Sequence, residues 1–227
     1  GFAKNIHVIL HGDGSVTVAD DGRGIPVGTH PEEQVPVVVL AFTRLHAGGK
    51  FDKTSGQAAY AFSGGLHGVG VAVTNALSTR VEVEVRRDGR IHNVVFSENG
   101  EKVSELETGE SCGRQSGTRV RAWPDARYFD SPKLPVAELE RLLRSKAVLL
   151  SGLTVTLEAE QGGAAKIWRY PLGLQGYLEE AGAGVDVVSA VYTGEKFASA
   201  DDETFAEGEG AAWAIGWFAE PVCAESY

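Results

Sequence analysis

Four glycines lie close together just before an apolar run. Gly64, Gly65, Gly68 and Gly70 fall within FSGGLHGVGVAVTNAL, which spans residues 62–77. Glycine leaves backbone N–H groups uncovered, and a helix N-terminus favours an anion because its amides are unpaired and its dipole is positive there. The run therefore predicts a phosphate-binding loop that leads into a helix. A flexible loop with a tight turn is the alternative for glycines alone.

The spacing of these glycines argues against two common nucleotide-binding motifs. It reads G-x-x-G-x-G, whereas the dinucleotide fingerprint reads G-x-G-x-x-G directly after a strand. The Walker A pattern also fails, because Gly49-Lys50 is followed by Phe51 and Arg44 stands where the first glycine should be. A P-loop is therefore not expected.

The sequence DDGRGIP at residues 20–26 is a second candidate site, because it follows a β-rich run. A carboxylate at a strand end can accept a hydrogen bond from an exocyclic amine such as adenine N6, and glycines at 22 and 24 leave room for a flat ring. An acidic turn that ends a hairpin is the plainer interpretation. Similarly, Lys50 either reaches a phosphate or is an exposed lysine, and Thr118 either faces a pocket or is an ordinary strand residue.

Composition restricts the class of protein. The chain has 227 residues, is 43% hydrophobic and carries a net charge of −10 from 31 acidic and 21 basic residues. This balance supports a packed core and argues against DNA binding by this segment itself. Cys112 and Cys223 form neither a disulfide framework nor a zinc motif, which fits a reducing cytoplasm. No run is long enough to span a membrane. The chain begins with Gly1 and contains no Met, so we expect a fragment.

Alternating and helical apolar patterns predict an α+β fold. We expect a single two-layer sandwich with a mostly antiparallel or mixed sheet and helices on one face. The expected strands cover 5–10, 15–19, 81–86, 91–96, 101–106, 117–123, 153–158, 167–170, 185–192 and 211–218. The expected helices cover 34–47, 69–77, 130–150 and 172–180, with a lid at 48–64 and a surface loop at 194–210. The expected buried faces of the first three helices are Val35, Val38, Val39, Phe42 and Leu45; Val69, Val73, Ala76 and Leu77; and Leu139, Leu142, Leu143, Ala147 and Leu150.

Three motifs in this order carry a resemblance to a known family. They are DDGRGIP at 20–26, LHAGGKF at 45–51, and SGGLHGVG at 63–70 followed by NALS at 75–78. They resemble the ATPase domain of type IIA topoisomerase B subunits, which belongs to the GHKL class of gyrase, heat-shock chaperones, histidine kinases and MutL. Arg86 to Gly89, Phe129 to Pro132 and Lys146 to Leu149 are more similar to the B subunit of topoisomerase IV than to that of gyrase.

The resemblance implies roles for individual residues. Asp20 would bind the adenine amine, directly and through a water that Gly24 and Thr118 also hold. Tyr60 would contact adenine or ribose, and Lys50 would lie at the edge of the triphosphate. The remaining residues form two implied groups. The triphosphate would be wrapped by Gly65, Leu66, His67, Gly68, Val69, Gly70 and Val71, and the rim that aminocoumarin inhibitors use would comprise Arg23, Ile25, Pro26 and Arg87.

The resemblance also implies a cofactor and partners. The family uses ATP with Mg²⁺, and a helix before the first strand carries both the general-base glutamate and the asparagine that holds Mg²⁺. We expect residues 1–227 to lack that helix and the transducer domain that follows. The parent would be a type II topoisomerase whose B subunits dimerise on ATP, act with an A-type subunit and contact DNA through other parts. The alternatives are a nucleotide- or inhibitor-binding module without turnover, the gyrase B subunit, and a mismatch-repair or chaperone ATPase.

Overall fold

The structure is a computed structural model that describes residues 2–45, 69–131, 134–199, 201, 204 and 209–222. Contacts within the chain divide it into two compact units. The first unit comprises residues 1–136 and 156–167, and the second comprises residues 137–155 and 168–227.

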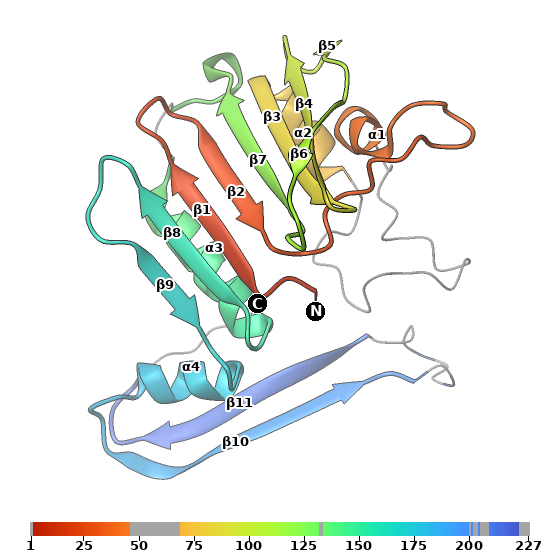
Figure 1. Cartoon of the computed structure of the whole chain (residues 1–227). Coiled ribbons are helices and arrows are strands. Elements are labelled where there is room, and N and C mark those ends of the chain that lie inside the picture. Colours follow the sequence, from red (N-terminus) through yellow and green to blue (C-terminus); the bar gives the residue numbers. More distant parts are fainter. Residues whose placement is uncertain are drawn as a thin grey trace. The chain divides into compact units, whose positions relative to one another are not determined.

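Nine strands of the described residues form one sheet (Figure 1). Its order is β5-β4-β3-β7-β2-β1-β8-β9, with β6 paired to β4. The pairs β1–β2, β2–β7, β7–β3 and β3–β4 are antiparallel. The strands are β1 (Asn5–Leu10), β2 (Val16–Asp20), β3 (Ser78–Arg87), β4 (Arg90–Ser97), β5 (Lys102–Val103), β6 (Glu107–Ser111), β7 (Gly117–Pro124), β8 (Thr154–Ala159) and β9 (Lys166–Arg169).

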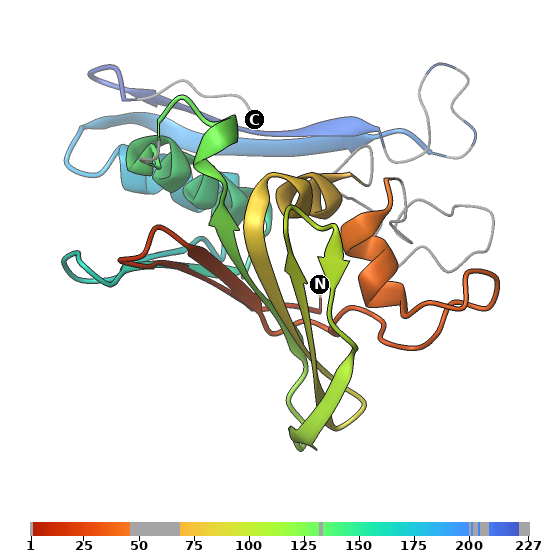
Figure 2. The same ribbon diagram turned by 90° about the horizontal axis from the view of Figure 1, so that it is seen from above.

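One face of this sheet carries the core of the first unit. Alternate side chains of β3 point to the same face, so Val81, Val83 and Val85 are buried together. Helix α1 (Val37–Thr43) packs on this face through Val38 and Phe42. Helix α2 (Gly70–Ala76) lies on the same side of the sheet, where it contacts α1 and β3 (Figure 2).

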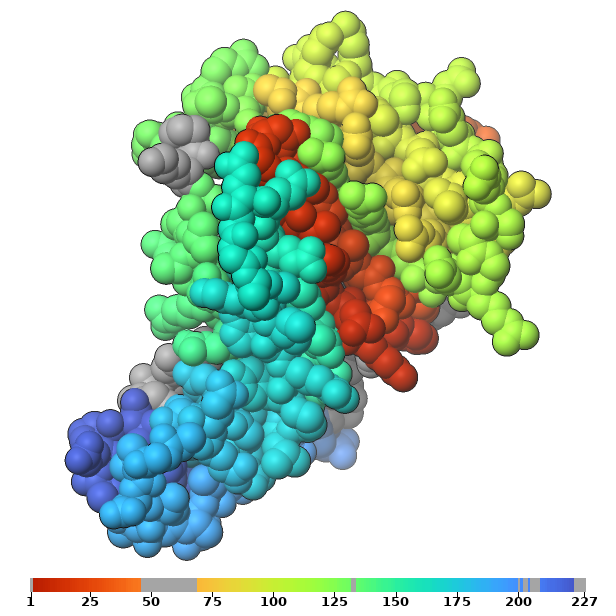
Figure 3. All heavy atoms as spheres, turned by 60° about the vertical axis from the view of Figure 1, so that its left-hand side comes forward, coloured from red at the N-terminus to blue at the C-terminus, as the bar shows by residue number. Residues whose placement is uncertain are grey.

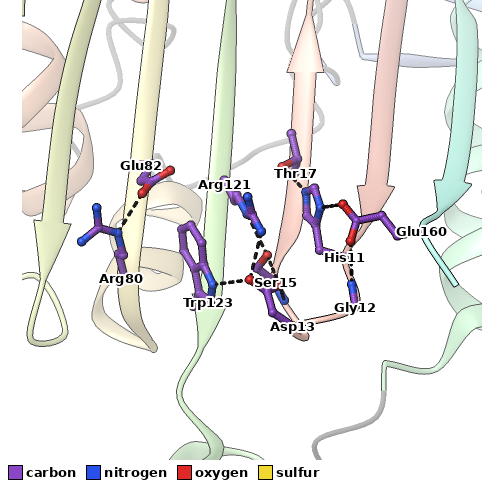
Figure 4. Close-up of polar contacts among 10 residues, drawn as sticks. All are labelled: His11, Gly12, Asp13, Ser15, Thr17, Arg80, Glu82, Arg121, Trp123 and Glu160. Atoms are coloured by element: carbon purple, nitrogen blue, oxygen red, sulfur yellow. Dashed lines mark hydrogen bonds and ion pairs between the residues drawn. The ribbon is translucent and has the colours of Figure 1, made fainter.

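The opposite face carries polar side chains, and Asp13 in the β1–β2 turn lies at the centre of one cluster. Its carboxylate accepts hydrogen bonds from the backbone N–H and hydroxyl of Ser15, from Arg121 Nη2 at 2.9 Å and from Trp123 Nε1 at 3.0 Å (Figure 4). The bonds from Ser15, followed by Trp123 and Arg121, hold the pKa of Asp13 well below its usual value. This cluster joins the β1–β2 turn to β7.

A second cluster on this face joins the same turn to the end of β8. His11 lies between Thr17 and Glu160: its Nε2 is 2.7 Å from Thr17 Oγ1 and its Nδ1 is 2.6 Å from Glu160 Oε1. Gly12 N donates to Glu160 Oε2 at 2.9 Å. Figure 3 shows the end of β8 against the N-terminal strands. The β1–β2 turn is therefore fixed from both sides by side chains.

The second unit contains the remaining helices and a separate hairpin. Helix α3 (Val136–Leu149) has its buried residues at Leu143, Ser145, Ala147 and Val148, and α4 is Leu174–Ala181. Strands β10 (Val187–Phe197) and β11 (Gly210–Phe218) form a two-stranded antiparallel sheet of their own. Phe218 packs against Gly182, the C-cap residue of α4.

The mixed α+β class and most of the predicted strands are confirmed, but several boundaries were wrong. Of the predicted strand 101–106 only Lys102–Val103 is a strand (β5), and the next strand, β6, begins at Glu107. The predicted loop 194–210 begins too early, because β10 continues to Phe197. The first predicted helix, 34–47, is shorter, because Pro36 occupies the N-cap position of α1 and the helix ends at Thr43.

Two predicted helix faces were also wrong. On α2 the buried residues are Ala72 and Asn75, whereas Val73 is 41% exposed. Asn75 turns inward because its Nδ2 donates to the carbonyl oxygen of Phe42 at 3.0 Å. On α3, Leu143 and Ala147 are buried as predicted, but Leu142 is 52% exposed and Leu150 53% exposed.

Candidate nucleotide site

The candidate site begins where the end of β2 lies beside the start of β7. Asp20 is the last residue of β2, and its partner in the β2–β7 register is Thr118. Thr118 in turn pairs with Val85 of β3, whose side chain belongs to the core. Directly opposed residues in antiparallel strands share a face. The carboxylate of Asp20 and the hydroxyl of Thr118 therefore extend from the face that also carries α1 and α2.

Glycine permits the close approach of these two strand ends. A Cβ on Gly117 would lie 2.0 Å from the carbonyl oxygen of Asp20, and Gly117 has φ +145°, which favours glycine. Gly24 has φ +72°, and a Cβ there would lie 2.8 Å from the carbonyl oxygen of Arg86. Any other residue at either position would move backbone that borders the site.

The neighbouring carboxylates of Asp20 and Asp21 accept hydrogen bonds from different parts of the chain. Asp20 Oδ1 accepts a hydrogen bond from Gly22 N at 2.7 Å. Asp21 turns the other way and accepts from the backbone N–H groups of Lys4 and Asn5 at 2.7 and 2.9 Å. Partial burial favours protonated Asp21, but the hydrogen bonds from Asn5 and Lys4 outweigh this effect and lower its pKa. Asp21 therefore fixes the start of β1 and does not join Asp20.

The rest of the turn at residues 21–26 is held by β3 and β7. Arg87 Nη1 donates to the carbonyl oxygen of Gly24 at 2.7 Å, and Ile25 N donates to Thr118 Oγ1 at 3.2 Å. Arg23 lies with its guanidinium 4.1 Å from the ring centroid of Phe2, a cation–π distance. Ile25 packs on the core, whereas Pro26 is exposed.

Helix α2 presents its N-terminal end without side-chain capping. Val69 precedes the helix and Gly70 begins it, and no atom of the described residues lies within 4 Å of a Cβ added to Gly70. Val71 is 42% exposed. Unpaired amides at such an end suit an anion. This end matches the part of the predicted phosphate loop that the structure describes.

Polar side chains anchor the other end of α2. Asn99 Nδ2 donates to the carbonyl oxygen of Ala76, at the end of the helix, and to Asp125 Oδ2. Asp125 also accepts bonds from Arg127, and these bonds, with that from Asn99, hold the pKa of Asp125 well below its usual value. A hollow of about 420 Å³, which Asn99 and Arg127 help to line, lies at this end of the helix. The hollow contains none of the predicted site residues.

The structure brings together some of the predicted site residues and leaves others untested. Asp20, Gly24 and Thr118 surround one corner, and Arg23, Ile25, Pro26 and Arg87 belong to its turn or to the strand that holds it. Val69, Gly70 and Val71 lie at the start of α2. The remaining predicted residues lie outside the described part of the chain: Lys50, Tyr60, Gly65, Leu66, His67 and Gly68.

The sequence did not predict the contacts of Asp21 with the start of β1 or the hydrogen bond from Arg87 to the turn. The alternation of a strand gives a signal for the first, because adjacent side chains at a strand end point to opposite sides. The bond from Arg87 has no local signal, since it joins residues 63 positions apart.

Within the described residues, no group of three or more His, Cys, Asp or Glu side chains is placed to hold a metal ion. No described helix is both long and apolar enough to cross a membrane.

Comparison with known proteins places this geometry in a family. Residues 1–128 match the model described as histidine kinase-, DNA gyrase B- and HSP90-like ATPase. The B subunit of DNA topoisomerase 4 from Escherichia coli is 47% identical over 230 residues, which cover 100% of this chain and 35% of that protein. The B subunit of DNA gyrase from Haloferax volcanii is 43% identical over 185 residues, which cover 79% and 28%.

Solved structures of topoisomerase IV and gyrase ATPase domains are also similar to this chain. The topoisomerase IV ATP-binding domain of Francisella tularensis, in complex with a small-molecule inhibitor, has a TM-score of 0.64 and 39% identity, covering 76% of this chain and 79% of that one. The 43K ATPase domain of Thermus thermophilus gyrase B, in complex with an aminocoumarin, has a TM-score of 0.69 and 30% identity, covering 88% and 49%.

The chain therefore belongs to the histidine kinase-, DNA gyrase B- and HSP90-like ATPases. Within this family it groups with the ATPase domains of type II topoisomerase B subunits, at higher identity to the topoisomerase IV relative than to the gyrase relative just described. This confirms the family and the GHKL fold expected from the three motifs. The chain spans about a third of the length of the curated relatives that it matches.

Proposed function

We propose that this domain binds ATP at the corner made by the end of β2, the turn at 21–26 and the start of β7, with the triphosphate at the N-terminal end of α2. The observation that carries the proposal is the register that sets Asp20 beside Thr118 on the face that bears α2. Asp20 accepts the adenine amine, and Gly24 and Thr118 share a water with it. Gly65 to Val71 surround the phosphates, and Lys50 and Tyr60 complete the site.

The corner suits an adenine ring for two reasons. A carboxylate offers about four acceptor positions, which suits the donor amine of adenine. Gly24 and Gly117 carry no side chain, which lets the turn and the start of β7 approach each other closely beside Asp20. Guanine presents a carbonyl oxygen where adenine presents the amine, so an acceptor at this position selects ATP over GTP.

We further propose the role of the parent protein. ATP with Mg²⁺ drives dimerisation of B subunits, and the closed dimer acts with an A-type subunit to pass one DNA segment through another, with DNA held by parts outside this chain. The general base and the Mg²⁺-holding asparagine belong to residues outside 1–227, as in the family. Aminocoumarin-type inhibitors bind the rim formed by Arg23, Ile25, Pro26 and Arg87. The domain works in the cytoplasm.

Calorimetry with ATP tests the central residue. Asp20→Ala should weaken ATP binding about tenfold to a hundredfold, because a hydrogen bond to a charged group contributes roughly 1.5–3 kcal/mol. Glu107→Gln, which removes a carboxylate from the exposed strand β6, is the control and should bind ATP as the wild type does. Equal ATP affinity of Asp20→Ala and wild type would remove Asp20 from the site.

Two assays separate the alternatives for activity. Phosphate release by residues 1–227, compared with the full-length protein, decides between an ATPase and a binding module without turnover. Decatenation compared with supercoiling by the full-length protein and its A-type partner distinguishes a topoisomerase IV from a gyrase. If the full-length protein with its partner catalyses neither decatenation nor supercoiling, another GHKL ATPase is favoured.

A further inference from the structure

The second carboxylate of the turn, Asp21, forms a clamp across the open end of the β1–β2 hairpin. The ladder between these strands ends at the pair Ile6 and Asp20. Just beyond it, Asp21 Oδ1 accepts from the backbone N–H groups of Lys4 and Asn5, and Asp21 Oδ2 accepts from Asn5 Nδ2 at 2.6 Å. Hydrogen bonds to an ionised acceptor are shorter and stronger than neutral ones. The clamp therefore holds one side of the turn firmly.

Asp21, the clamp residue, directly follows Asp20, the candidate adenine acceptor, in the chain. Asp20 is oriented by its bond from Gly22 N, and the position of Gly22 N depends on the backbone of Asp21. A Cβ on Gly22 would lie 2.7 Å from Asp20 Oδ1 and 3.6 Å from the Cβ of Ala3, so the segment before β1 lies close to this peptide. Any movement of Asp21 relative to Asn5 consequently turns the donor that orients Asp20.

We propose that Asp21 is a positioning residue for adenine recognition: its clamp on Lys4 and Asn5 holds the turn so that Asp20 stays aimed at the base. The inference rests on the proposed function, because it assigns Asp21 to the same site. Asp21 itself does not touch the nucleotide, since its carboxylate is directed to the start of β1.

The mutual bond between Asn5 and Asp21 allows an exchange experiment. Asp21→Asn keeps an acceptor for the two backbone N–H groups but removes the charge, and the amide of Asn5 must turn over before its Oδ1 can accept from the new amide. Asn5→Asp sets two carboxylates against each other. The double variant Asn5→Asp/Asp21→Asn restores one donor, one acceptor and the original net charge.

Affinities for ATP and for adenosine are measured by calorimetry, well below the melting temperature of the least stable variant. Each single variant should lose about threefold to tenfold in affinity for both ligands, the range expected when one hydrogen bond is misaligned. The double variant should recover most of this loss. Adenosine is needed because it is uncharged, so the altered charge of the single variants cannot explain its weaker binding. Glu107→Gln again serves as the charge control.

The possible outcomes separate this inference from the proposed function. Unchanged affinity in Asp21→Asn, alongside weakened binding in Asp20→Ala, would overturn the positioning role and leave the adenine site intact. The positioning role would also be overturned if the single variants lose affinity and the double variant does not recover it. The same holds if the single variants lose affinity for ATP but not for adenosine. If Asp20→Ala binds ATP normally, the proposed adenine site itself is wrong.

Discussion

Gly117 offers the sharpest test of how the site is built, because its substitution should disturb backbone and not only side chains. In Gly117→Ala the new Cβ would lie 2.0 Å from the carbonyl oxygen of Asp20 and 3.0 Å from its carbonyl carbon. Overpacking typically costs about 1–3 kcal/mol, and a sparsely populated backbone conformation, here φ +145°, costs about 1–3 kcal/mol more. We therefore expect a loss of about 4 kcal/mol in the free energy of unfolding.

Urea unfolding measures this loss, and Gly113 gives a matched control. Gly113 also has a positive φ, +60°, but nothing lies within 4 Å of an added Cβ. Gly113→Ala should therefore cost only the backbone strain, about 1–2 kcal/mol. The difference between the variants reports the collision with Asp20, and any folded Gly117→Ala protein should bind ATP weakly. Equal stabilities of the two variants would refute the close approach of β2 and β7.

Three other substitutions test the core, the far end of α2 and the phosphate end of the site. Phe42→Ala should destabilise the domain by about 3–5 kcal/mol in urea unfolding, because the ring is fully buried, whereas Phe129→Ala, with 44% of its residue exposed, should have little effect. Asp125→Asn should lower the melting temperature at pH 7, because the folded state lowers the pKa of this carboxyl. The difference in melting temperature from the wild type should shrink as the pH falls below about 4. The exposed control Asp130→Asn should show no such pH dependence. Gly70→Val should leave the melting temperature unchanged, since an added Cβ meets no atom of the described residues within 4 Å, but it should weaken binding of ATP and not of adenosine by calorimetry. Unchanged ATP binding would place the phosphates elsewhere.

The parts of the fold that sequence predicted well depend on local patterns. The alternation of valine and charge in β3, with Asp88-Gly89 after it, specified a hairpin that the structure confirms. The parts that it predicted poorly depend on contacts between distant residues. Asn75 is buried because it bonds to Phe42, 33 positions away, and this contact overrides the apolar pattern of α2. The division of residues 194–210 between strand and loop likewise depends on pairing with β11.

The choice between Asp20 and Asp21 shows how long-range register completes a local motif. Adjacent residues at a strand end point to opposite sides, so only one carboxylate of the pair can share a face with the core. The motif alone does not say which one. The register does, because Val85 faces the core, Thr118 is opposite Val85, and Asp20 is opposite Thr118. These successive register pairs set Asp20 on the side of α2 and leave Asp21 to clamp the start of β1. A register shift of one residue between β2 and β7 would therefore place Asp21 on the side of α2 and Asp20 on the opposite side.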